Sequence, residues 1–345
     1  MTRQRKVLLH TCRCALLLVA GISWPSGEAE AITTCSAATP DLLFGNVADG
    51  TGVAAGTTVS IECSTLGLSL LGQARVRMCL NIDDGSAGPP GTVDRYLVND
   101  SGDLLRFQIY RDAARSQIWG SSSTPARPTP RLLDLQYSVP VLGGTGSATV
   151  PVHAWIYPQS ELSAGVHRNQ FDGLQARLDY RYNEYVLIIP LPFPDSCTSG
   201  GMGGASISFG FTAAASVPDS CRVEAADDLD FGNIPGLLNT PVDQDSAITL
   251  TCTNRTAWNL SLDNGQHAAG NTRRMLRTSE GSHVSYELYR DSARALRWGA
   301  TRNVDTQTGV GTGGPQTVTV HGRVPAGQAI PAGGYRDTVT LTISY

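Results

Sequence analysis

The stretch Ala-Ser-Ile-Ser-Phe-Gly-Phe-Thr-Ala, residues 205–213, alternates apolar side chains with small or polar ones. A period of two is typical of a β-strand that buries one face. The face expected to be buried consists of Ile207, Phe209, Phe211 and Ala213. The stretch lies between two similar halves of the chain, and neither half contains another copy of it. It therefore predicts a strand that closes one half and has no counterpart in the other.

Residues 1–31 have the features of a secretory signal peptide. Basic residues near the start precede an apolar run over 15–22, and Ala29-Glu30-Ala31 fits the small-x-small cleavage rule. We therefore expect export to the periplasm and then to the cell surface, with a mature chain that begins at Ile32.

The mature chain would keep 22 of the 26 basic residues and 28 of the 30 acidic ones. A mildly acidic chain without a basic run is a poor candidate for nucleic-acid binding. Its even number of cysteines, six, favours disulfides in an exported protein. Short alternating runs separated by Gly, Asn, Asp and Pro predict an all-β fold.

Two segments of the chain match each other in order, which predicts one fold used twice. We expect a first domain over 32–215, with its own seventh strand at 205–213, and a second over 216–345. Six or seven short strands each, with one disulfide, favour immunoglobulin-like sandwiches. Pairing Cys35 with Cys63 and Cys221 with Cys252 would clip the first two strands of each. The matched features are Cys35 and Cys221, Phe44 and Phe231, Cys63 and Cys252, Ile109–Asp112 and Leu288–Asp291, Trp119 and Trp298, His153 and His321, and Ala164–Arg168 and Ala332–Arg336.

Features present in both copies are interpreted as core and turn residues. One histidine per copy, His153 or His321, has no second ligand at metal-binding spacing. No Gly-x-Ser-x-Gly elbow, His-Glu-x-x-His pair or phosphate-binding Gly-Lys-Thr occurs in the sequence. We therefore expect no enzyme activity, metal or cofactor.

The repeated Cys…Phe-Gly-Asn…Cys pattern, the Tyr-Arg-Asp…Trp-Gly block and the Pro-Ala-Gly ending resemble the spore coat protein U domain family. The resemblance covers both copies. It implies a subunit of archaic, Csu-type chaperone–usher pili, and two such domains in one chain imply the tip subunit. The implied partners are a periplasmic chaperone, an outer-membrane usher and the donor strand of the adjacent pilin.

The second copy ends at Tyr345, where its sixth strand ends, so we expect it to lack a covering strand. The resemblance implies that the next subunit supplies this strand, by β-strand addition. Only three residues of the expected mature chain precede Cys35, so we expect it to receive a strand and to donate none.

Three apolar insertions occur only in the first copy, around Leu66–Leu71, Leu132–Val141 and Tyr185–Pro194. We expect them to emerge at one pole as a hydrophobic binding tip; the alternative is that they are extra strands, above all 132–142. A Cys79–Cys197 disulfide would fasten the last loop. The predicted binding residues are Leu66, Leu68, Leu70, Leu71, Val186, Leu187, Ile188, Ile189, Leu191 and Phe193.

The leading hypothesis is a pilus-tip adhesin that attaches bacteria to abiotic or host surfaces during biofilm formation. One alternative is a structural cap that starts or ends the fibre. Another is a sugar-binding adhesin that uses Trp155 or tyrosines as stacking platforms.

Overall fold

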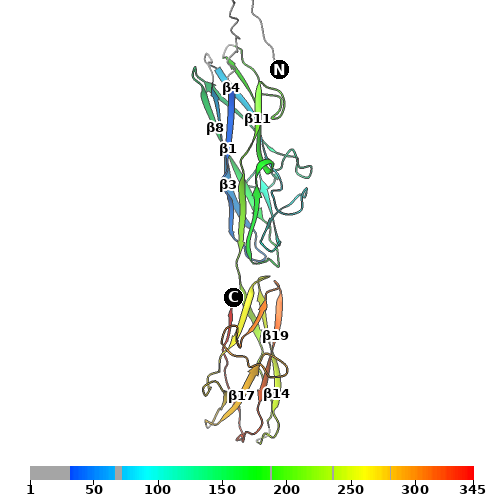
Figure 1. Ribbon diagram of the computed structural model, residues 1–345, viewed down its shortest axis with the longest axis vertical. Coiled ribbons are helices and arrows are strands. Elements are labelled where there is room, and N and C mark those ends of the chain that lie inside the picture. Colours follow the sequence, from blue (N-terminus) through cyan, green and yellow to red (C-terminus); the bar gives the residue numbers. More distant parts are fainter. Residues whose placement is uncertain (1–31, 67–71, 187–188, 235–236, 280) are drawn as a thin grey trace, which may run out of the picture.

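The computed structural model describes residues 32–66, 72–186, 189–234, 237–279 and 281–345. Within them the chain is almost wholly β, with a single turn of 3-10 helix, η1 (Gly173–Gln175), so the all-β prediction is confirmed. Figure 1 shows two elongated domains stacked end to end, with the chain's C-terminus near the waist between them.

Domain one is a sandwich of an eight-stranded sheet, ordered β1-β3-β8-β6-β5-β9-β12-β2, and a four-stranded sheet, ordered β11-β10-β4-β7. Its core contains Phe107, Trp119 and Phe171, all fully buried. The strands are β1 (Ile32–Ala38), β2 (Leu42–Asn46), β3 (Val53–Leu66), β4 (Gly72–Ile82), β5 (Arg95–Val98), β6 (Leu104–Tyr110), β7 (Arg131–Val139), β8 (Gly144–Ile156), β9 (Gly165–Phe171), β10 (Ala176–Val186), β11 (Gly203–Ser208) and β12 (Phe211–Val217).

Domain two repeats this plan with fewer strands. A six-stranded sheet, β13-β14-β19-β17-β16-β20, packs on a three-stranded sheet, β18-β15-β21. Trp298 fills its core as Trp119 does in domain one. The strands are β13 (Cys221–Ala226), β14 (Val242–Cys252), β15 (Ala257–Leu262), β16 (Arg273–Arg277), β17 (His283–Tyr289), β18 (Gln307–Val310), β19 (Pro315–Val324), β20 (Tyr335–Arg336) and β21 (Leu341–Ser344).

The stretch predicted as a single strand, 205–213, is divided between the two sheets of domain one. Its first part belongs to β11, which pairs with β10, and its second to β12, which lies antiparallel to β9 and parallel to β2. Gly210 stands at the break, where a Cβ would lie 2.8 Å from the Asp172 carboxylate. β12 continues to Val217, two residues past the expected domain boundary at 215.

The apolar side chains of this stretch face the core. Phe209, Phe211 and Ala213 are buried, and Ile207 is half-buried against the same cluster. The Phe211 ring stacks on Phe171, with centroids 4.7 Å apart and planes 9° apart. β11 and β12 therefore complete the domain-one core by packing as well as by ladder hydrogen bonds.

Three disulfides link Cys35 with Cys63, Cys79 with Cys197, and Cys221 with Cys252. The first and third join directly paired residues of neighbouring strands, β1 with β3 and β13 with β14. The second closes a loop of 118 residues and joins β4 to the segment that follows β10.

Candidate functional site: an apolar pole and an open sheet edge

Strand registers bring the start of β1 and three connections of domain one to a single end, which we call the apolar pole. Ile32 pairs with Leu66, and Thr65 pairs with Gly144. Gly72 lies between Val139 on one side and Val186 on the other. The connections 66–72, 139–144 and 186–203 therefore all begin or end at this pole.

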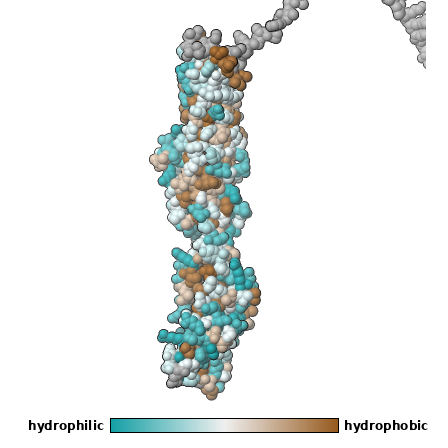
Figure 2. Space-filling view, turned by 90° about the vertical axis from the view of Figure 1, so that its left-hand side faces the viewer, coloured by the Kyte–Doolittle hydropathy of each residue, from teal (hydrophilic) through white to brown (hydrophobic). Residues whose placement is uncertain are grey.

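Exposed apolar side chains gather there. Leu142 is 86% exposed, Leu66 69%, Ile189 64% and Val141 47%. Figure 2 shows brown, apolar residues at this end of domain one. Five of the predicted binding residues lie outside the described residues, as does the side chain of Val186. These five are Leu68, Leu70, Leu71, Leu187 and Ile188.

The turn between β7 and β8 contributes two apolar residues that were absent from the predicted set. Gly143 N–H donates to the Pro140 carbonyl at 2.9 Å, closing a turn that leaves Val141 and Leu142 at its outer side. Gly143 has φ +115°, and a Cβ there would lie 2.5 Å from the Thr65 carbonyl oxygen. The sequence signal was the Val-Leu pair before Gly-Gly at 143–144.

Residues 131–139 are not a loop at the pole. They form β7, which pairs with β4 along the edge of the four-stranded sheet. Leu133 and Leu135 are half-buried against the core. The alternative of an extra strand is therefore the correct one for this insertion, and only its turn reaches the pole.

Residues 189–202, which we call the strap, lie along the outer face of the four-stranded sheet. Arg75 donates to the Leu191 carbonyl at 2.7 Å and Arg77 to the Pro194 carbonyl at 3.0 Å. Both guanidinium groups also lie over the Phe193 ring, 5.4 and 5.7 Å from its centroid. Leu191 and Phe193 are therefore half-buried on the side of the domain, whereas Ile189 is exposed.

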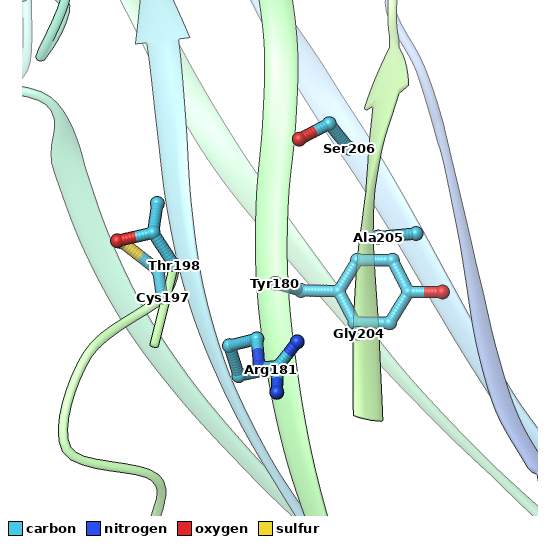
Figure 3. Close-up of a pocket in the computed structure, with 7 residues that line it drawn as sticks. All are labelled: Tyr180, Arg181, Cys197, Thr198, Gly204, Ala205 and Ser206. Carbon is cyan, nitrogen blue, oxygen red and sulfur yellow. The ribbon is translucent and has the colours of Figure 1, made fainter. Parts of the chain in front are cut away.

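A cavity of about 170 Å³ lies between the strap and the β10–β11 edge (Figure 3). Its polar side chains are already engaged. The Tyr180 hydroxyl accepts from Cys35 N–H at 3.2 Å, and Arg181 donates to the Gly200 carbonyl at 2.6 Å. Ser206 donates to Asp179 at 2.5 Å. We therefore assign this cavity no ligand.

A polar cluster lies between the sheets beneath the apolar pole. The Thr33 hydroxyl is 2.6 Å from that of Thr65 and donates to Glu184 at 2.6 Å. Thr65 is 2.8 Å from the Tyr137 hydroxyl. Burial raises the pKa of Tyr137, so this phenol stays neutral. These bonds join β1, β3, β7 and β10 close to the ends from which the connections of the apolar pole start.

Two sheet edges that are covered by strands in domain one are open in domain two. Strands β9 and β10 of domain one pair with β12 and β11, whereas no strand among the described residues pairs with the outer edges of the equivalent β20 and β21. Phe171 and Leu178 are fully buried, but the matching Val339 and Ile343 are only half-buried. Apolar surface thus lies along an unpaired edge.

Trp155, one of the residues suggested as a sugar-stacking platform, is covered on one face of its ring. The Arg115 guanidinium carbon lies 4.0 Å from the Trp155 ring centroid, so this face of the indole is covered. Among the described residues, no group of three or more His, Cys, Asp and Glu is placed to hold a metal ion. The same residues include no helix long and apolar enough to span a membrane.

Comparisons with known proteins find similarity to one curated relative and to several solved structures. Protein U of Myxococcus xanthus is 32% identical over 158 residues, which cover 44% of this chain and 78% of that protein. The CsuC–CsuE chaperone–tip adhesion subunit pre-assembly complex, from archaic chaperone–usher Csu pili of Acinetobacter baumannii, is 17% identical at a TM-score of 0.44, covering 90% of this chain and 100% of that one. The CupB6 tip adhesin from Pseudomonas aeruginosa is 12% identical at a TM-score of 0.33, covering 90% and 93%.

The model of the Spore Coat Protein U domain matches residues 26–171 and 207–342. These matches include most of both domains and the repeated motifs that suggested the resemblance. The chain belongs to the Spore Coat Protein U domain family.

Proposed function

We propose that this chain is the tip subunit of a chaperone–usher pilus and attaches the cell to surfaces through the apolar pole. The observation that carries the proposal is the group of exposed Leu66, Val141, Leu142 and Ile189 at one end of an elongated molecule. Contiguous exposed apolar residues usually mark interaction surfaces. Each Leu or Ile contributes about 1.5–3 kcal/mol when fully buried. Attachment requires contact and no catalysis.

The repeat itself supports a terminal position. In domain two the connection between β14 and β15, residues 253–256, contacts domain one through Asn254 and Arg255. The same connection of domain one is the apolar insertion 66–72. In domain two, this end of the fold contacts the preceding domain. In domain one, the same end of the fold carries apolar loops instead, which suits contact with a surface.

Domain two would be completed by a strand from the next subunit, with β11 and β12 as the template. Such a strand would pair first with β21 and then run antiparallel to β20, as β12 does to β9. Val339 stands where domain one has the larger Phe171. The donated strand therefore has room, at the position that Phe211 takes in domain one, for a larger apolar side chain. A periplasmic chaperone would lend a strand to the same edge before delivery to an outer-membrane usher.

Attachment is tested with Leu142→Asp in assembled pili. A charge within the apolar pole opposes its burial, so attachment to a hydrophobic surface should fall while pilus number stays constant. The matched control is Leu174→Asp, because Leu174 is also exposed, at 71%, but lies on η1 away from the pole. Equal attachment by Leu142→Asp and the parent would contradict the adhesive role.

Strand acceptance is tested with a synthetic peptide of residues 203–217 added to the full chain from which its chaperone has been removed. We expect slower amide exchange in β20 and β21. A peptide carrying Asp at positions 209 and 211 should have no effect, because those side chains would be buried. If neither peptide changes exchange, domain two is not an acceptor of such strands.

A structural cap is a second candidate. It is favoured by the same observation, that domain one has apolar insertions where domain two has the connection that contacts the preceding domain. The Leu142→Asp variant separates the two roles. A pure cap would keep its attachment and its fibre number, because the substitution leaves the rest of the pole in place.

A further inference from the structure

The contact between the two domains is built on a short backbone bridge. Ala164 N–H donates to the Asn254 carbonyl at 2.8 Å, and Asn254 N–H donates to the Leu162 carbonyl at 3.2 Å. This is a parallel bridge between Ser163 and Asn254. In such a bridge the N–H and carbonyl of Ser163 itself take no part.

Two side-chain contacts reinforce the bridge. The Asn254 amide donates to the Ser163 hydroxyl at 2.7 Å. Arg255 forms a bidentate ion pair with Asp103 across the waist. The Arg255 guanidinium lowers the pKa of Asp103 to about 2, so the pair is charged at neutral pH.

The opposite end of domain two carries the same element without a partner. By the repeat, Ile330, Pro331 and Ala332 correspond to Leu162, Ser163 and Ala164. Leu162 is buried, whereas Ile330 is half-buried and the next two residues are exposed. Within the described residues, neither the Ala332 N–H nor the Ile330 carbonyl has a hydrogen-bond partner.

This end also exposes apolar surface. Leu237 is 66% exposed and is bridged to Ala329, the residue before Ile330. We call Leu237 and Ala329–Ala332 the docking pole. Pro331 does not obstruct a bridge of the internal kind, because the central residue needs no N–H.

We propose that the docking pole binds the body of the following pilin through a copy of the internal bridge. Ala332 N–H and the Ile330 carbonyl pair with that pilin's connection between its second and third domain strands. The proposal rests on the proposed function and adds a second contact besides the donor strand. The occupant is a domain of the same family, because domain two itself supplies such a connection at the waist.

The copy lacks both reinforcing contacts. Pro331 replaces the Ser163 hydroxyl, and Ser282 stands where domain one has Asp103. The Asp103–Arg255 ion pair therefore has no counterpart among the described residues of this end, and the joint between tip and shaft bends more easily than the waist.

The test is hydrogen exchange of the full chain in two complexes. One contains the whole pilin that follows it in its fibre, and the other only a synthetic peptide of that pilin's N-terminal extension. Both should slow exchange in β20 and β21, but only the whole pilin should slow it at 330–333. Equal exchange at 330–333 in the two complexes overturns the docking proposal. Unchanged exchange in β20 and β21 would instead refute strand acceptance, so the two failures are distinguishable.

A variant pair makes the test specific. Ala332→Pro removes the donating N–H, so the protection of 330–333 by the whole pilin should be lost while that of β20 and β21 remains. Ala326→Pro, at an exposed position of the same connection, serves as the control and should keep both. Protection of 330–333 that survives Ala332→Pro contradicts the bridge.

Discussion

Replacing Phe211 by Ala removes the largest side chain with which β12 fills domain one. Phe211 is 4% exposed and stacks on Phe171. Loss of a buried Phe costs about 3–5 kcal/mol, and the ring pair accounts for roughly 0.5–1.5 kcal/mol of it. With a urea m value of about 2 kcal/mol/M, the unfolding midpoint of domain one should fall by about 2 M.

The assay must report on each domain separately. Pulsed hydrogen exchange along a urea titration reads β4 for domain one and β15 for domain two. We expect the shift in β4 and none in β15. The control, Thr212→Ala, changes the neighbouring residue, whose side chain is only half-buried, and should shift the midpoint by less than about 0.5 M. A shift below about 0.5 M for Phe211→Ala, or one confined to domain two, would refute the assignment of β12 as the closing strand.

Three further changes test other contacts. Asp103→Asn removes the ion pair with Arg255, worth about 0.5–1 kcal/mol because Arg255 is half exposed, and should widen the interdomain angles seen by X-ray scattering. Because folding lowers the pKa of this carboxyl to about 2, the parent should lose the same contact as the pH falls from about 4 towards 2. Glu287→Ala leaves the fully buried Arg273 without its carboxylate and should cost about 3–5 kcal/mol in urea, whereas Glu287→Gln should cost less. Gly210→Val places a Cβ 3.0 Å from a backbone oxygen of the facing strand and should lower the domain-one midpoint by an amount equivalent to about 1–3 kcal/mol.

The repeat and the alternation of apolar residues were enough to predict two all-β domains. Those signals are local or depend on comparing one half of the chain with the other. The division of 205–213 between two sheets could not be predicted. The edges of β10 and β9, with which its two parts pair, come next to each other only after the sandwich has formed. Alternation looks the same whether a strand keeps one partner or changes it.

Buried arginines were missed for a different reason. Arg95 and Arg273 are fully buried. Each donates to an aspartate carbonyl, of Asp83 or Asp263, and to the carbonyl of the core tryptophan, Trp119 or Trp298. An arginine in a short polar segment normally indicates a solvated surface. Only the matching position in the two copies could have suggested a shared structural role.

The sequence predicted a set of apolar binding residues, and the side chains exposed at the apolar pole overlap with that set only in part. Leu66 and Ile189 are exposed there, whereas Phe193 packs on Arg75 and Arg77. Hydrophobicity alone cannot distinguish a side chain that meets solvent from one that covers guanidinium groups on a sheet. Leu142 was missed because the sequence does not show where a strand ends and its turn begins.

The covalent link from β12 through residues 218–220 into domain two determines how the molecule bears load. A pull along the long axis is transmitted into β12 parallel to its length. Seven paired residues along β9 then resist together, in shear, instead of opening one after another. Among the described residues, two backbone bonds, the Asn254–Ser163 side-chain bond and a partly exposed ion pair cross the waist, so it yields before either sandwich. Under flow the molecule would therefore bend at the waist while both sandwiches stay intact.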